Sequence, residues 1–152
     1  MQPFPCAGII VFRGNVSALP SEARGKALPT GIQTILARTE RNNYSFPKGK
    51  RNKGETDIVA AWRKLQEETG LTQNSVRLLE GVHFDELTGK GNPSVRYFVG
   101  ALIDGGQHKL TFDLSELAGV EWHSIGDALQ LEGLREARRS ILGRAYNIYI
   151  EE

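Results

Sequence analysis

One stretch of this sequence, GKRNKGETDIVAAWRKLQEETGL at residues 49–71, organises the rest of the chain. It reads as a basic, glycine-bearing loop, then a helix, then a glycine that stops the helix. Glu67 and Glu68 are adjacent near the helix end, so the two carboxylates cannot both pack into a core. Hard divalent cations such as Mg²⁺ and Mn²⁺ take carboxylate oxygens as ligands, and such ions bridge phosphate oxygens.

The apolar spacing within this stretch predicts which side of the helix is buried. Thr56 or Asp57 can cap the start of the helix, and Gly70 can end it. The predicted buried face consists of Ile58, Trp62, Leu65 and Thr69. The charged side chains lie off this face, toward a cleft or solvent. They form two pairs at a spacing of four residues, Arg63 with Glu67 and Lys64 with Glu68.

The composition is that of an ordinary single domain. The chain has 152 residues, 39% of them hydrophobic and 24% charged, which is enough for one core. A net charge of +1 argues against a protein that coats nucleic acid generally, but leaves room for local basic patches. Cys6 is the sole cysteine, which excludes an intrachain disulfide and a cysteine zinc site. We find no membrane-spanning apolar run and no signal peptide, so we expect a cytoplasmic protein without a membrane partner.

Short apolar runs on both sides of residues 49–71 predict a sheet. The expected strands are Cys6–Arg13, Ile32–Arg38, Tyr44–Phe46, Ser75–Phe84, Ser94–Ile103, a short one at Lys109–Phe112, and Gly119–His123. The expected later helices are Ser124–Leu131 and Glu132–Ala145. Gly14–Gly31 lacks hydrophobic periodicity and contains several prolines and glycines, so we expect a surface loop there, not a second domain.

Residues 49–71 resemble the Nudix box, a pattern of glycines, glutamates, one arginine and aliphatic residues at fixed spacing. Eight of its nine specified positions are matched, by Gly49, Glu55, Arg63, Leu65, Glu67, Glu68, Gly70 and Leu71. Lys64 departs from the pattern, because the family has glutamate there. The resemblance implies a single Nudix domain over residues 1–152. Its α+β fold would be the Nudix α/β/α sandwich, a mixed β-sheet between helices with the box as loop, helix and loop.

The resemblance also implies a site. In the family, the carboxylates that match Glu67 and Glu68 hold Mg²⁺ or Mn²⁺ against a diphosphate. The glycine that matches Gly49 offers its carbonyl to the same metal. The metal neutralises phosphate charge and activates or positions the water that attacks phosphorus. Arg63 is expected to pair with Glu55 and to orient the carboxylates through its fork of N–H donors.

Lys64 puts the activity of such a site in question. Many family members have at this position a glutamate that binds metal or takes part in general-base chemistry, and an ammonium can do neither. Beside Glu68, the ammonium would neutralise a carboxylate meant for the metal. Either a one-metal or reduced activity remains, or the protein binds phosphate ligands without turning them over.

Glu116 is a candidate substitute, as catalytic base and as metal ligand. It lies six residues before Trp122. This segment resembles the messenger-RNA decapping branch, in which a loop glutamate so placed serves as base or extra metal ligand. Glu116 can equally be an exposed loop acid.

The loop at residues 48–53 carries four cations, which suits it to the capture of polyphosphate. The segment Phe46–Lys50 is similar to the loop of the diadenosine tetraphosphate, diphosphoinositol and decapping branches. The predicted substrate-binding residues are Lys48, Lys50, Arg51, Arg96 and Tyr97. Among these, Arg96 would clamp phosphate and Tyr97 would stack on a base, although Tyr97 can equally belong to the core.

The predicted function is that of a metal-dependent Nudix pyrophosphohydrolase. Its substrate would be a nucleoside diphosphate linked to another group, with a dinucleoside polyphosphate or capped-RNA-like compound favoured over diphosphoinositol compounds. The alternative is a catalytically weak Nudix-fold protein that binds nucleotide, RNA or a protein partner. Lys64 is the feature that separates the two.

Overall fold

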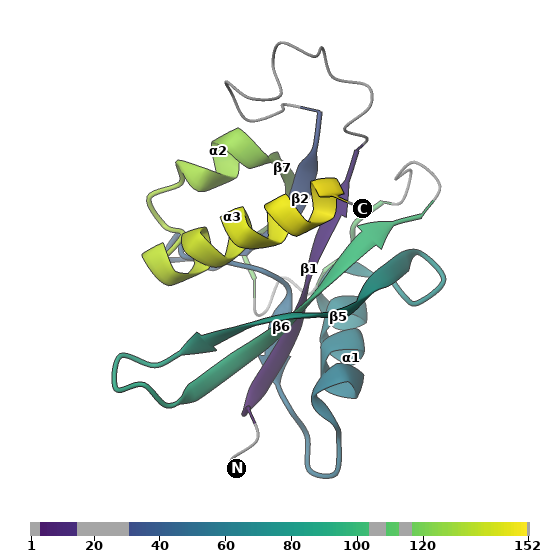
Figure 1. Cartoon of the computed structure of the whole chain (residues 1–152), viewed down its shortest axis with the longest axis vertical. Coiled ribbons are helices and arrows are strands. Elements are labelled where there is room, and N and C mark those ends of the chain that lie inside the picture. Colours follow the sequence, from purple (N-terminus) through teal and green to yellow (C-terminus); the bar gives the residue numbers. More distant parts are fainter. Residues whose placement is uncertain (1–3, 15–30, 104–108, 113–116, 152) are drawn as a thin grey trace.

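The computed structural model describes residues 4–14, 31–103, 109–112 and 117–151 (Figure 1). The strands are β1 (Cys6–Arg13), β2 (Gln33–Arg38), β3 (Tyr44–Ser45), β4 (Lys48–Lys50), β5 (Val76–Leu87), β6 (Pro93–Leu102) and β7 (Gly119–Ser124). The helices are α1 (Asp57–Thr69), α2 (Ile125–Leu129) and α3 (Glu136–Glu151). None of the helices in these ranges is long and apolar enough to cross a membrane.

Strand β1 is the centre of a mixed sheet in the order β3-β2-β1-β6-β5. It runs parallel to β6 along most of its length, and antiparallel to β2 and to β4. Strand β7 extends the sheet by pairing with β2. Six consecutive residues of β1, Ala7–Phe12, are buried, because both faces of the strand are covered.

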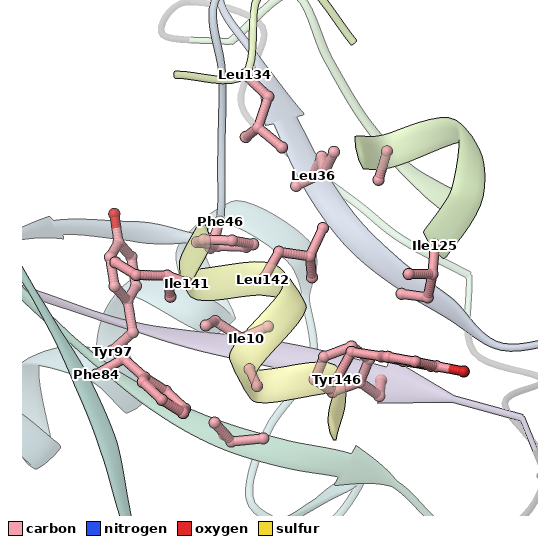
Figure 2. Packing of buried hydrophobic residues seen from close by; sticks show 14 of the residues in the cluster. Ile10, Leu36, Phe46, Phe84, Tyr97, Ile125, Leu134, Ile141, Leu142 and Tyr146 are labelled. Carbon is pink, nitrogen blue, oxygen red and sulfur yellow. The ribbon is translucent and has the colours of Figure 1, made fainter. Parts of the chain in front are cut away.

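Helices cover the two faces of this sheet and form a core on each (Figure 1). On one face, Ile10 and Phe12 of β1 belong to a cluster with residues of α2 and α3. Figure 2 shows Ile141 and Leu142 of α3 packed beside Ile10 in this cluster. On the other face, Ile9 and Val11 of β1 pack with residues of α1. The α+β sandwich with a mixed sheet between helices, predicted from the sequence, is therefore the observed fold.

Helix α1 begins and ends where the sequence predicts. The side chain of Thr56 accepts a hydrogen bond from the backbone N–H of Val59 at 3.3 Å, as an N-cap does. Gly70 ends the helix with φ +83°, a left-handed conformation that glycine adopts without strain. After its first two residues, which belong to β4, the box thus forms the loop, helix and loop expected of it.

The buried face of α1 is wider than predicted, and it is shifted. It consists of Ala60, Ala61, Leu65, Glu68 and Thr69, whereas Ile58 is 39% exposed and Trp62 is half-buried. The helix packs against β4 as well as β1, so the small alanines face the sheet and Glu68 is covered. The predictions that Ile58 is buried and that Glu68 lies off the buried face are therefore wrong. The spacing of large apolar residues within the helix cannot predict that β4 packs beside it.

Several element bounds differ from the expected ones. Strand β4 forms from lysines that the sequence assigned to a loop, since its backbone pairs with Cys6, Ala7 and Gly8 of β1. The expected strand at Lys109–Phe112 is absent from those four described residues. Instead, the backbone N–H of Thr111 donates to the Thr69 carbonyl, 2.9 Å away, at the end of α1. Helix α3 begins at Glu136 and continues to Glu151, six residues beyond the predicted end at Ala145. Residues 15–30 of the expected surface loop lie outside the described ranges.

Candidate active site

Arg63 joins the loop of the box to the end of its helix. Its Nε lies 2.7 Å from Oε2 of Glu55, and its Nη2 lies 2.9 Å from Oε1 of the same carboxylate. Nη2 also donates to the backbone carbonyl of Lys50 at 2.8 Å. Nη1 donates to Oε2 of Glu67 at 3.0 Å. One planar guanidinium therefore fixes the end of β4, the loop and the carboxylate of Glu67 relative to one another.

Glu55 is held ionised by this arrangement. The hydrogen bond from Arg63 lowers the pKa of Glu55 from its ordinary value of 4.5 to about 2, and the backbone N–H of Asn52, at 2.8 Å, adds to the shift. The same hydrogen bond raises the pKa of Arg63 above its already high ordinary value. Both groups therefore keep their charges throughout the neutral range.

The two carboxylates at the helix end have different surroundings. The Glu68 side chain is only 10% exposed, and its Oε1 accepts a hydrogen bond from the backbone N–H of Lys48 at 3.3 Å. Glu67 is 49% exposed, and a hydrogen bond from Lys64 lowers its pKa. Glu68 is thus fixed against β4, whereas Glu67 faces solvent on one side.

Lys64 reaches both carboxylates. Its Nζ lies 2.9 Å from Oε1 of Glu67 and 3.8 Å from Oε2 of Glu68. The predicted contact of Lys64 with Glu68 is present, and the shorter contact is with Glu67. The Lys64 side chain is 13% exposed and lies against Gly49. A Cβ added to Gly49 would collide with Lys64 Cε and lie 3.0 Å from Lys64 Nζ.

The charged cluster at the end of α1 consists of Glu55, Arg63, Lys64, Glu67 and Glu68, and its carboxylate oxygens suit a cation. The carboxylates of Glu67 and Glu68 both lie within ion-pair distance of the Lys64 ammonium, and the Lys64 side chain lies against Gly49. Glu55, Glu67 and Glu68 oppose Arg63 and Lys64, which leaves one net negative charge. No group of three or more Asp, Glu, His or Cys side chains that could hold a metal occurs in the described part of the chain. Glu116, the predicted third carboxylate, lies outside that part.

The basic loop lies against this cluster through its backbone. Lys48 donates its N–H to Glu68, and Lys50 offers its carbonyl to Arg63. Arg51 follows directly, and its N–H donates to the Pro5 carbonyl at 2.8 Å. The sequence did not indicate these main-chain contacts, because they depend on the pairing of β4 with β1.

Arg96 lies at the opposite end of α1 from the carboxylates. Its Nε and Nη2 contact Asp85 at 2.9 and 3.1 Å, and its Nη1 contacts Asp57 at 3.3 Å. Asp57 is the first residue of α1 and Glu67 comes ten residues later, so about 15 Å of helix separates them. The charge of Arg96 is already paired at this position, and the structure does not bring it to the predicted metal ligands.

Tyr97 belongs to the core. It is fully buried (Figure 2). Its hydroxyl donates to Oε1 of Glu86 at 2.8 Å. Its ring contacts Phe46 edge to face, with centroids 5.1 Å apart. Burial also raises the pKa of its hydroxyl. Of the two interpretations of Tyr97 that the sequence left open, the core position is confirmed and stacking on a base is wrong, because Tyr97 has no exposed surface in the folded chain.

Comparison with known proteins places the chain in a family. The model of the NUDIX domain matches residues 11–144. The chain therefore belongs to the NUDIX domain family, as the box suggested. Over 110 residues it is 31% identical to an 8-oxo-(d)GTP phosphatase of Mycolicibacterium smegmatis, a match that covers 72% of this chain and 33% of the relative. The chain thus spans about a third of the length of that curated relative.

Solved structures share the fold at low identity. A Caenorhabditis elegans Ap4A hydrolase in a binary complex has a TM-score of 0.73 and 21% identity, with 96% of each chain covered. The M. smegmatis Nudix hydrolase RenU has a TM-score of 0.67 and 14% identity, over 97% of this chain and 86% of that one. The NUDIX domain of Shewanella oneidensis NrtR, complexed with ADP ribose, has a TM-score of 0.64 and 13% identity, over 98% of this chain and 90% of that one. At these identities the likeness concerns the fold alone.

Proposed function

We propose that this chain hydrolyses a pyrophosphate bond in a nucleoside diphosphate linked to another group, with Mg²⁺ or Mn²⁺. The observation that carries the proposal is the contact of Arg63 with Glu55, Glu67 and the Lys50 carbonyl. This arrangement holds Glu55, the end of β4 and the carboxylate of Glu67 in one fixed geometry. Such preorganisation is what catalysis on a phosphate chain requires.

Each residue of the cluster has a role in this proposal. Glu67, Glu68 and the carbonyl of Gly49 would hold the metal, which when bound neutralises phosphate charge and lowers the pKa of water. Arg63 orients Glu67 and keeps the loop in place. Glu68 is held by the N–H of Lys48, so its carboxylate needs little reorganisation. Glu116 stays a proposed base or additional ligand.

The proposed substrates carry several phosphates. Lys48, Lys50 and Arg51 stand next to the carboxylate cluster and can attract a polyphosphate chain. A dinucleoside polyphosphate or a capped-RNA-like compound is therefore our first candidate, ahead of diphosphoinositol compounds. The 31% identity to an 8-oxo-(d)GTP phosphatase supports an oxidised guanine nucleotide as a second candidate.

A substrate panel with matched variants tests the proposal. The wild type is assayed with Mn²⁺ against a dinucleoside tetraphosphate, a cap dinucleotide, 8-oxo-dGTP and a diphosphoinositol compound. Glu67→Gln with Glu68→Gln should abolish turnover of the accepted substrate, because the amides remove both negative charges. Glu80→Gln, an exposed glutamate on β5, is the control and should leave turnover unchanged. Unchanged turnover in the double variant would exclude this cluster as the site.

Lys64 favours the alternative, a binding protein with weak or no catalysis. Its ammonium contacts the carboxylates that the metal would need. In that case the wild type binds members of the panel but turns none of them over. Titration of each compound in the presence of Mn²⁺, followed by product analysis, separates a binding protein from an enzyme.

A further inference from the structure

Lys64 occupies a defined place between the box loop and the helix end. We propose that its ammonium is a tethered cation which occupies the cation position of Glu67 and Glu68, so that a divalent metal binds there only when Lys64 leaves. This proposal rests on the metal site of the proposed function and concerns how that site is controlled. It assigns to Lys64 a role as an internal competitor of the metal.

Burial distinguishes Lys64 from an ordinary surface lysine. Lysine side chains are mostly exposed, whereas the side chain of Lys64 is 13% exposed. Its Nζ contacts one exposed and one buried carboxylate, at 2.9 and 3.8 Å. A solvent-exposed lysine–glutamate pair on a helix would contribute only a few tenths of a kcal/mol, so a metal could break it easily. Contact with the buried Glu68, in contrast, places the ammonium where water screens it less.

Gly49 makes room for the lysine side chain. Strand β4 pairs Gly49 with Ala7, and this register turns the α-carbon of Gly49 toward the aliphatic part of Lys64. An added Cβ would collide with Lys64 Cε and lie 2.8 Å from Cδ. The colliding atoms are at the flexible end of a long side chain, so Gly49→Ala should displace Lys64 and leave the backbone in place. The Gly49 carbonyl, a proposed metal ligand, is retained in that variant.

Two variants can therefore take the Lys64 ammonium away from Glu67 and Glu68 in independent ways. Lys64→Met keeps an unbranched apolar side chain and deletes the charge, whereas Gly49→Ala keeps the charge and displaces it. Gly89→Ala is the control, because a Cβ there meets nothing within 4 Å. Both test variants should bind Mn²⁺ more tightly than the wild type, by about tenfold or more, since a like charge leaves the site. The control should match the wild type.

Mn²⁺ binding is measured without nucleotide, by calorimetry or by loss of the free-ion paramagnetic resonance signal. Adding Glu67→Gln and Glu68→Gln to Lys64→Met should remove the gain, which locates the bound ion at the two carboxylates. A change below twofold in both Lys64→Met and Gly49→Ala would overturn the proposal. The same holds if the gain survives loss of the two carboxylates. If Gly49→Ala fails to fold, Lys64→Met decides.

Chemical labelling of the amine gives a readout that is independent of affinity. Reductive methylation of the wild type, followed by peptide mass spectrometry, compares Lys64 with the exposed Lys53. Lys64 should react more slowly than Lys53 without metal, and faster once Mn²⁺ saturates the site. In Gly49→Ala it should react fast without metal. Equal rates for Lys64 and Lys53 in the metal-free wild type, unaffected by Gly49→Ala, would overturn the proposal.

The two proposals fail in different experiments. An absence of turnover across the substrate panel, together with tighter Mn²⁺ binding in Lys64→Met and Gly49→Ala, refutes the hydrolase and leaves the tethered cation in place. Turnover that depends on Glu67 and Glu68, together with unchanged Mn²⁺ affinity in those variants, refutes the tethered cation alone.

Discussion

Arg138 of α3 and Glu86 of β5 form a buried ion pair, in which Nε lies 3.1 Å from Oε1. Their side chains are 8% and 3% exposed. The hydroxyl of Tyr97 donates to the same carboxylate oxygen, and Nη1 of Arg138 donates to the backbone carbonyl of Tyr44 at 3.0 Å. The network therefore ties α3 to the sheet and to β3, the strand that precedes Phe46, Pro47 and the box loop.

We predict that breaking this pair on one side destabilises the fold strongly. Glu86→Gln leaves the Arg138 guanidinium buried without a charged partner there, which should lower the free energy of unfolding by about 3–5 kcal/mol. Tyr97→Phe removes one hydrogen bond to a charged group and should cost about 1.5–3 kcal/mol. Urea unfolding followed by circular dichroism measures both changes.

The controls for this prediction are a second ion pair and a double variant. Glu136→Gln loses a pair with Arg139 whose glutamate side chain is 83% exposed, so it should change the free energy by less than about 0.5 kcal/mol. Glu86→Gln combined with Arg138→Met should cost less than the sum of the two single changes, because the guanidinium that Glu86→Gln alone leaves buried without a charged partner is then absent. Strict additivity would show that the two residues do not interact energetically.

A second prediction concerns acid stability. The pKa of Glu55 falls from 4.5 to about 2 on folding, so its ionised form is favoured in the folded state. A depressed carboxyl pKa contributes stability that is fully present above the ordinary pKa and is lost as pH falls toward the folded value. The contribution of Glu55 should therefore disappear between about pH 4.5 and pH 2. Glu55→Gln should lack this part of the pH dependence.

This is measured by urea unfolding at a series of pH values for the wild type and Glu55→Gln. The difference in unfolding free energy between the two proteins should be constant above pH 5 and shrink as the pH falls to about 2. A difference that does not vary with pH would show that Arg63 does not stabilise the carboxylate of Glu55.

Much of the fold can be predicted from local sequence patterns, because helix caps and apolar runs lie within single helices and strands. Thr56 and Gly70 bound α1 as expected, since capping depends on the residues at the helix ends. β1 matches its predicted range, because a continuous apolar run is typical of a central strand. What the sequence did not reveal depends on pairing between distant segments. This applies to β4, to the covered position of Glu68 and to the choice between core and surface that the sequence left open for Tyr97. The same limit applies to Lys64, whose contact with Gly49 arises only when β4 lies beside α1.

A third prediction separates the buried and exposed faces of α1. Leu65 is fully buried in the cluster with Ile9 and Val11, whereas Val59 on the same helix is 51% exposed. Leu65→Ala should lower the free energy of unfolding by about 2–5 kcal/mol, since it removes apolar contacts and leaves a cavity. Val59→Ala should change it by less than about 0.5 kcal/mol, because it is a surface substitution to a better helix former. Equal losses in urea unfolding would mean that α1 does not pack as described.

The last prediction concerns the cations of the box loop. The side chains of Lys48, Lys50 and Arg51 should attract substrate phosphate by charge, an effect that added salt weakens. Changing all three to serine should raise the Michaelis constant, or the dissociation constant in the absence of turnover, by about tenfold or more at low salt. The contacts of Lys48 and Lys50 with the site are made by backbone atoms, so the cluster should stay assembled in this variant. The matched control changes the exposed Arg41, Arg77 and Lys90 to serine, which removes the same net charge elsewhere.

The affinity for the substrate is measured at low and at high salt for the wild type, the loop variant and the control. The wild type and the control should lose affinity with salt in parallel, and the loop variant should be nearly insensitive. An equal loss in the loop variant and the control would mean that overall charge, not the loop, attracts the substrate.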